Sequence, residues 1–213
     1  MGRAILFCLG LFAVALGAAG PALSADRIKF TDAEIADLDR ISDYLNSIHT
    51  MKGGFSQIDP DGDVDQGTFA IAKPGRMRFE YKPPAATLIV SDGHTVAVQN
   101  SKLKTVDRYP LGQTPLNLVL GDHVDLAHDK SIVGIVHRDD AVVVRARSRN
   151  GNSQGDITLV FSDPNLELRQ WTVIDDQGLQ TTVALRDVQI GADVSGIQFT
   201  VPDKNPFAHK QAD

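Results

Sequence analysis

The sequence has few groups that could support covalent chemistry. Its one cysteine, Cys8, lies in an apolar run near the N-terminus, so no disulfide can form within the chain and packing alone must stabilise the fold. His123 and His128 are five residues apart, a spacing that does not place two metal ligands on one helix face. We expect no catalytic set, no metal and no cofactor. A hydrolase whose triad assembles from distant positions stays open.

Aromatic residues, basic runs and long apolar runs are also scarce. Aromatic residues make up 6% of the chain, and acids outnumber Lys and Arg by 27 to 21, for a net charge of −6. An acidic chain without a basic run is a poor candidate for binding nucleic acid or anionic membrane surfaces. Beyond the N-terminus, no apolar run is long enough to span a bilayer. A hydrophobic content of 42% over 213 residues is typical of one globular domain.

The N-terminus has the pattern of a secretory signal peptide. Arg3 precedes an apolar stretch at residues 4–19, and small residues at 21–25 predict cleavage after Ser24 or Ala25. We expect a mature domain at residues 26–213, placed in the periplasm. Cleavage removes Arg3 and no acid, which leaves 20 bases against 27 acids and a net charge of −7. A lipidated N-terminus is disfavoured, because most of the apolar run follows Cys8 instead of preceding it.

Two helices are expected. Thr31-Asp32-Ala33-Glu34 is a capping box that predicts a helix to about His49. Its apolar residues recur at helical spacing and form a stripe: Ile35, Leu38, Ile41, Leu45 and Ile48. A short helix is predicted at residues 114–121, with Thr114 as N-cap, Pro115 at the first helical position and Gly121 at the end. Ordinary burial and a role as a lid both fit this second helix.

Outside these two helices, apolar and polar residues alternate in short runs, as they do in β-strands. Residues 67–93 carry three runs joined by a Lys73-Pro74-Gly75 turn and a Pro83-Pro84 break, and Met77, Phe79 and Tyr81 share one strand face. Residues 59–65 suggest a calcium loop, but Val64 stands where that loop needs glycine, so a solvated hairpin tip is favoured. A bulge is predicted near Asp187 and Val188. Further strands are predicted at 51–57, 95–99, 103–109, 132–137, 141–147, 156–161, 166–174, 179–190 and 197–201.

These strands in meander order predict an α+β, mostly β fold. We expect a strongly curved antiparallel sheet of about ten or eleven strands, an incomplete β-barrel covered by the long N-terminal helix and short mid-chain helices. Its apolar inner face could pack shut or could hold an acyl chain. Pattern alone favours the packed core.

The order of several short motifs resembles the periplasmic outer-membrane lipoprotein carrier family, the LolA-like proteins. The matching residues begin with Gly53-x-Phe55-x-Gln57 after the first helix and continue through Lys73-Pro74 and Arg78-Phe79-Glu80-Tyr81 to Asp92-Gly93. The Thr114-Pro115 helix start, Trp171, and Phe199 with Pro202 extend the match over nearly the whole mature chain.

The resemblance implies a periplasmic carrier and not an enzyme. Such a carrier takes triacylated lipoproteins from an inner-membrane ABC-type releasing complex, without nucleic acid and as a monomer. At the outer membrane it either delivers them to a separate receptor or inserts them itself, and both alternatives stay open. It implies that Lys73, where the family commonly has Arg, fastens the helical lid to backbone carbonyls around Leu45, Val119, Leu120 and Trp171. A relative that binds another amphiphile, such as a glycolipid, or that senses lipoproteins for a regulator is the alternative. The implied acyl-chain cavity comprises Leu45, Phe55, Phe69, Met77, Phe79, Tyr81, Val90, Leu116, Val119, Leu120, Phe161, Trp171 and Phe199.

Overall fold

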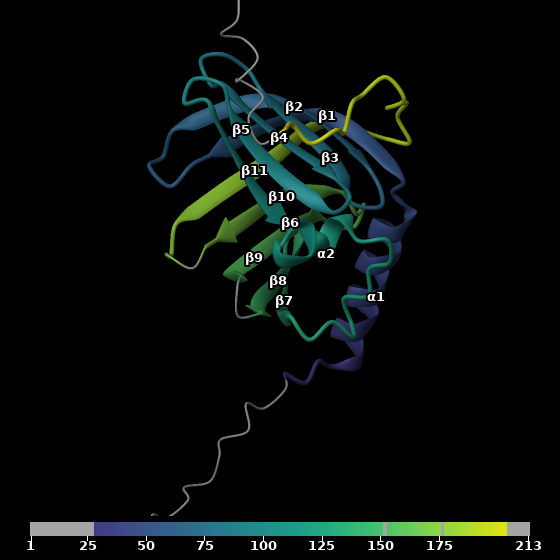
Figure 1. Cartoon of the computed structure of the whole chain (residues 1–213). Coiled ribbons are helices and arrows are strands. Elements are labelled where there is room, and N and C mark those ends of the chain that lie inside the picture. Colours follow the sequence, from purple (N-terminus) through teal and green to yellow (C-terminus); the bar gives the residue numbers. More distant parts are fainter. Residues whose placement is uncertain (1–27, 151–152, 176, 204–213) are drawn as a thin grey trace, which may run out of the picture.

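The fold is a long curved sheet wrapped around one helix and a mid-chain segment (Figure 1). The structure, a computed structural model, describes residues 28–150, 153–175 and 177–203. The predicted signal peptide at residues 1–25, Cys8 included, lies outside the described residues. Within the described ranges, no helix has both the length and the apolar character needed to cross a membrane.

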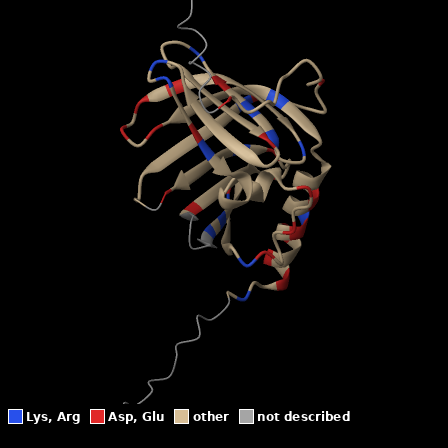
Figure 2. Cartoon of the chain, viewed as in Figure 1, with Lys and Arg blue, Asp and Glu red and all other residues tan. Residues whose placement is uncertain are grey.

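Helix α1 spans Asp32–Ser47 and begins with the predicted capping box. The Thr31 hydroxyl accepts from the backbone N–H of Glu34, and the Glu34 carboxylate accepts from the backbone N–H of Thr31 at 2.8 Å. Leu38, Ile41 and Leu45 are buried, but Ile35 is 37% exposed. The apolar stripe therefore begins one turn later than predicted, because the first turn does not pack against the sheet. The opposite face of α1 is acidic (Figure 2).

The eleven strands of the described ranges form one antiparallel sheet in the order β6-β5-β4-β3-β2-β1-β11-β10-β9-β8-β7. Their bounds are β1 Thr50–Ile58, β2 Val64–Ala72, β3 Arg76–Tyr81, β4 Thr87–Asp92, β5 Thr95–Asn100, β6 Thr105–Pro110, β7 Ile132–Arg138, β8 Ala141–Asn150, β9 Ser153–Ser162, β10 Leu168–Ile174 and β11 Gln180–Ile190. The central pair, β1 and β11, joins the first half of the chain to the second. With β6 and β7 as edges, the sheet is an open, incomplete barrel.

Strand alternation gives this sheet two different faces. The inner face carries Phe69, Met77, Phe79 and Tyr81, all buried in the core. The outer face carries Arg76, Arg78 and Glu80 on β3, with Val90 and Ala97 beside them on β4 and β5. The predicted bulge is confirmed: the β1–β11 register shifts between Lys52 and Gly54, and Asp187 has a φ of 53°.

The predicted last strand at residues 197–201 is wrong. Residues 191–203 form no strand and cross the outer face, where Arg78 donates to the Gln198 carbonyl and the Arg76 guanidinium lies 5.7 Å from the centre of the Phe199 ring. The reason is topological. Strand β11 already pairs with β1 on one side and β10 on the other, so no free edge remains beside it for the next segment.

Residues 111–131, here called the crossing segment, run between the edge strands β6 and β7. The segment contains a 3₁₀ turn, η1 Leu111–Gln113, and a single helical turn, α2 Asn117–Leu120. The predicted helix at 114–121 is therefore shorter than expected. The Thr114 hydroxyl donates to the Leu111 carbonyl at 2.8 Å and does not cap α2.

Candidate functional site

An aromatic cluster occupies the inner face where β1, β2, β3 and β10 meet. Phe79 is its centre: its ring stacks on Phe69 at 5.5 Å and meets the edges of Phe55 at 5.0 Å and Trp171 at 5.9 Å. The Tyr81 hydroxyl donates to the Gln57 side-chain oxygen at 2.6 Å, and burial raises the pKa of Tyr81. The aromatic cluster is thus apolar, with the phenol of Tyr81 satisfied internally by Gln57.

Helix α1 and the crossing segment are fastened to each other over this face. The Asn46 side chain donates to the Val124 carbonyl at 2.8 Å and accepts from the Val124 N–H at 2.9 Å. One turn earlier, the buried Ser42 hydroxyl accepts from the Leu126 N–H at 2.9 Å. Because Ser42 and Asn46 are four residues apart, they share one helix face. The sequence did not lead us to predict this role for Ser42 and Asn46. The available signal was the presence of two polar residues, four apart, beside the apolar stripe of the helix.

We call α1 and the crossing segment together the cover. Lys73 links this cover to the sheet. Its ammonium donates to the Leu45 carbonyl at 3.0 Å, near the C-terminal end of α1. Partial burial lowers the pKa of Lys73, and the charge of Asp122 opposes that shift. Two residues on, the Gly75 N–H donates to the Leu120 carbonyl at 2.8 Å. The β2–β3 turn therefore contacts both α1 and α2 through backbone carbonyls. Of the four carbonyl regions predicted for Lys73, the one at Leu45 receives its hydrogen bond.

A second set of polar contacts ties α1 to the far half of the sheet. Arg40 bridges Asp37 on its own helix and Asp163 after β9, at 3.2 and 2.9 Å. Asp37 also contacts the His137 ring nitrogen on β7 at 2.9 Å. The Tyr44 hydroxyl accepts from the Leu168 N–H at 3.1 Å. Helix α1 is therefore held on both sides of the inner space by a small number of hydrogen bonds and ion pairs.

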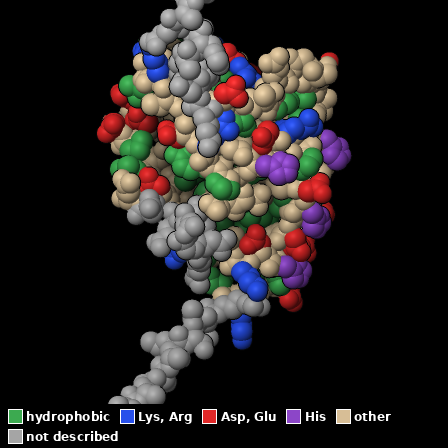
Figure 3. Space-filling model, in the orientation of Figure 1, with side chains coloured by type: hydrophobic (Ala, Val, Ile, Leu, Met, Phe, Trp, Pro, Cys, Tyr) green, Lys and Arg blue, Asp and Glu red, His purple; other side chains and the backbone are tan. Residues whose placement is uncertain are grey.

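Histidines do not gather into a metal site in the described ranges. Figure 3 shows their side chains apart from one another along one side of the molecule, with acidic side chains between them. His128 pairs with Asp125 at 3.0 Å; this hydrogen bond raises the pKa of His128 and lowers that of Asp125. No group of three or more His, Cys, Asp or Glu able to hold a metal ion occurs among the described residues.

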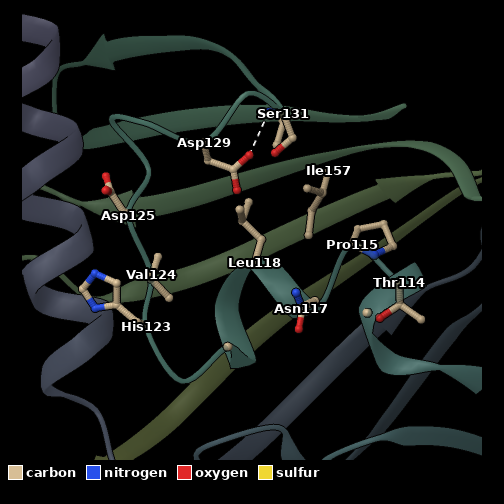
Figure 4. Close-up of a pocket in the computed structure, with 13 residues that line it drawn as sticks. Thr114, Pro115, Asn117, Leu118, His123, Val124, Asp125, Asp129, Ser131 and Ile157 are labelled. Carbon is tan, nitrogen blue, oxygen red and sulfur yellow. Dashed lines mark hydrogen bonds between the residues drawn. The ribbon is translucent and has the colours of Figure 1, made fainter. Parts of the chain in front are cut away.

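One pocket of about 240 Å³ opens beside the crossing segment. Leu118 and Val124 of that segment and Ile157 of β9 lie around it (Figure 4). Ala146 and Ile157 belong to the inner face, so the pocket leads toward the core. Its volume is below the roughly 300–1,000 Å³ of ordinary ligand sites. Among the described residues, buried apolar side chains occupy most of the inner space.

A family model and sequence relatives show to which family the chain belongs. The family model "Outer membrane lipoprotein carrier protein LolA" matches residues 46–202. The outer-membrane lipoprotein carrier protein of Bordetella pertussis is 31% identical, over 91% of each chain. A protein of the same name from Dechloromonas aromatica is 28% identical, over 74% of this chain and 79% of its own. The chain belongs to the outer-membrane lipoprotein carrier family. A LolA superfamily structure from Nitrosomonas europaea aligns with a TM-score of 0.38 at 12% identity, over 76% of this chain and 97% of that one.

Most residues predicted to line a carrier cavity do face the inner space. Leu45, Phe55, Phe161 and Trp171 are buried in its core, and Leu116 packs against it partly exposed. The same holds for Phe69, Met77, Phe79, Tyr81, Val119 and Leu120.

Two residues predicted to line the cavity, Val90 and Phe199, lie on the outer face of the sheet instead of the inner face. Val90 pairs with Arg78 and Ala97 on the outer face, and Phe199 lies over Arg76 on that same face. Val90 is 0% exposed although it faces outward. An apolar residue in a strand can thus be buried on either face, and strand register places Val90 on the outer one.

The chain also contains the residue pattern of a nucleophile elbow, Gly-x-Ser-x-Gly, which its sequence analysis did not single out. Residues 151–155 read Gly-Asn-Ser-Gln-Gly. An elbow needs a strand-to-helix turn that raises the serine at its apex. Here β9 begins at Ser153 and continues as a strand to Ser162. Ser153 therefore lies at the start of a strand and not on a strand-to-helix turn.

Proposed function

We propose that this protein carries the acyl chains of lipoproteins between the two membranes of the bacterial envelope. The inner face of the open sheet would hold the chains after α1 and the crossing segment move aside. The observation that carries the proposal is the combination of an apolar, aromatic-lined inner face with a cover, α1 and the crossing segment, that packs its own apolar side chains on that face and adds a few polar bonds. Lipoproteins released by an inner-membrane ABC-type complex are the proposed cargo, and an outer-membrane receptor is the proposed destination.

The energetics explain why such a cargo needs a carrier. Each methylene removed from water is worth ~0.8 kcal/mol, so ten shielded methylenes amount to ~8 kcal/mol. Release then requires that closing the cover recovers part of this energy. Closure restores the contacts of α1 and the crossing segment with the core, together with the hydrogen bonds of Lys73, Ser42 and Asn46. The cover would thus compete with the acyl chain for the same apolar surface.

Lys73 is the proposed latch between cover and sheet. Its single hydrogen bond to Leu45 joins the β2–β3 turn to the end of α1. An arginine at this place could hold several carbonyls with its planar fork, whereas lysine is one mobile point donor. We therefore propose a latch that opens more readily than one built on arginine.

The sole tryptophan provides the test. Trp171 is 8% exposed and lies against Phe79 on the inner face. The mature protein is titrated with a lipoprotein whose acyl chains carry a nitroxide or bromine quencher, which acts only near the indole. We expect strong quenching with the acylated form. The same lipoprotein with its acylated cysteine replaced should give no quenching.

A tryptophan moved to the outer face is the matched control. In the double variant Trp171→Phe/Phe199→Trp, the indole lies on the other side of the sheet, near Arg76. We expect little quenching there. Equal quenching of both indoles, or quenching of neither, contradicts acyl-chain binding on the inner face. Native mass spectrometry then identifies the cargo: a one-to-one complex with the acylated protein supports the carrier, and a bound lipid without polypeptide supports the amphiphile-binding alternative.

A further inference from the structure

The tip of the β5–β6 hairpin, residues 101–104, presents an apolar side chain to solvent. Leu103 is 72% exposed, the largest value among the exposed large hydrophobic side chains of the described residues. Lys102 and Lys104 flank it, and both are exposed. Leu103 is therefore an apolar side chain in solvent with a cationic side chain on either side.

The backbone of this tip is fixed by hydrogen bonds. The Asn100 side-chain oxygen accepts from the N–H groups of Lys102 and Leu103, each at 3.0 Å. The Ser101 N–H donates to the Ala86 carbonyl of the β3–β4 turn at 2.9 Å. Lys104 adopts a left-handed backbone conformation with φ of 56°. The turn is therefore built so that Leu103 points outward and does not fold back onto the sheet.

Positive charge gathers around this leucine. Lys82 begins the β3–β4 turn, to which the tip is hydrogen-bonded, and it is also exposed. We call Lys82, Lys102, Leu103 and Lys104 the basic tip. Figure 2 shows Lys and Arg on the hairpin ends at the upper left of the molecule and Asp and Glu on the hairpin end below them. A protein with a net charge of −6 thus has a cationic region on the hairpins nearest its β6 edge.

The nearest strongly acidic feature at this end of the sheet is the β1–β2 tip, with Asp59, Asp61 and Asp63. It lies four strand spacings from the β5–β6 tip, which is about 19 Å at ~4.8 Å per strand. The Debye length in physiological salt is about 8 Å. A charged surface that touches Lys102 and Lys104 would therefore be largely screened from the acidic hairpin, whereas Lys82 lies only two strand spacings from it, about 10 Å.

We propose that the basic tip binds the surface of anionic phospholipid bilayers. Leu103 would enter the interface between headgroups and acyl chains, and the three lysines would pair with lipid phosphates. The tip lies at the opposite end of β2 and β3 from the Lys73 turn, so membrane contact would leave the cover free to move. This inference goes beyond carriage of lipoproteins and does not depend on it.

Vesicle co-sedimentation of the mature protein without cargo tests the inference. Vesicles of phosphatidylcholine with 40% phosphatidylglycerol would be compared with phosphatidylcholine alone, at low and at physiological salt. We expect binding to the anionic vesicles only, weakening as salt rises. A lysine near an anionic surface contributes about fivefold in binding, so Lys102→Gln/Lys104→Gln should weaken it about 25-fold. Leu103→Ser should weaken it by up to about tenfold.

Two matched control variants distinguish the role of the basic tip from the effect of a change in net charge and from the loss of an exposed leucine elsewhere. Lys29→Gln/Lys130→Gln makes the same change in net charge at exposed positions away from the tip, and Leu179→Ser removes an exposed leucine from the β10–β11 tip. We expect each to change binding less than twofold. Equal binding to neutral vesicles, no binding to anionic vesicles, or equal losses in the tip and control variants would each overturn the inference.

Discussion

Replacing Lys73 by methionine should loosen the cover over the inner space. Methionine keeps most of the aliphatic stem and removes the ammonium that donates to the Leu45 carbonyl at 3.0 Å. A hydrogen bond from a charged group contributes about 1.5–3 kcal/mol when well buried. Lys73 is only partly buried, and the charge also costs desolvation there. We therefore expect a net loss of about 1 kcal/mol, which is about a fivefold rise in the open population.

Hydrogen exchange of the α1 amides measures this opening directly. In Lys73→Met, amides near Leu45 should exchange about fivefold faster than in the original protein, and Lys73→Arg should restore protection or exceed it. Lys52→Met is the matched control. Lys52 donates to the Asp193 carbonyl at 3.4 Å, in the C-terminal segment away from α1, so its loss should leave α1 unchanged.

Two results would refute the reasoning. If exchange of α1 is the same in Lys73→Met as in the original protein, the hydrogen bond to Leu45 does not hold the cover. If exchange rises equally across β2, β3 and α1, the substitution has lowered global stability instead of releasing one element. A selective rise in α1 and the crossing segment, together with faster cargo exchange, is the outcome expected of a latch.

Three further predictions concern stability and ionisation. Gly67→Ala should cost at least ~2 kcal/mol in denaturant unfolding, because the added Cβ would overlap a carbonyl of β3, whereas Gly112→Ala has open space and should be nearly neutral; similar losses would contradict this packing. Leu159→Ala, at a fully buried inner-face position, should cost ~2–5 kcal/mol, and a cost under 1 kcal/mol would mean that the core collapses around the site. The hydrogen bond to Asp125 favours protonated His128 and raises its pKa, so its NMR titration midpoint should fall in Asp125→Asn; an unchanged midpoint would exclude the pairing.

Local sequence signals determined most of the secondary structure. The capping box at Thr31 and Glu34 fixed where α1 begins, because its hydrogen bonds need only four consecutive residues. The phase change near Asp187 located the bulge, since an extra residue reverses which side chains face inward. The signal peptide and the mature-domain boundary stay predictions, because they rest on residues outside the described ranges.

Net charge was a poor guide to local surfaces. The expectation against anionic membranes rests on the whole chain, whereas Lys82, Lys102 and Lys104 lie together at one end of the sheet, and the vesicle experiment decides between the two. These lysines come from two hairpin turns that only strand pairing brings side by side. Screening makes the field near a surface depend on charges within about one Debye length, so a sum over the whole chain does not describe it.

Tertiary structure alone decided which alternating residues face the inner space. Alternation assigns the residues of a strand to two faces, but it does not say what covers each face. Val90 is buried on the outer face of β4 and Phe199 lies over the same outer face, so neither lines the core. Residues 197–201 alternate like a strand and remain unpaired because β11 has no free edge. Ser42 and Asn46 gained their role only when the crossing segment came within hydrogen-bonding distance of α1. In each case the deciding partner is distant in sequence, and no local pattern encodes its position.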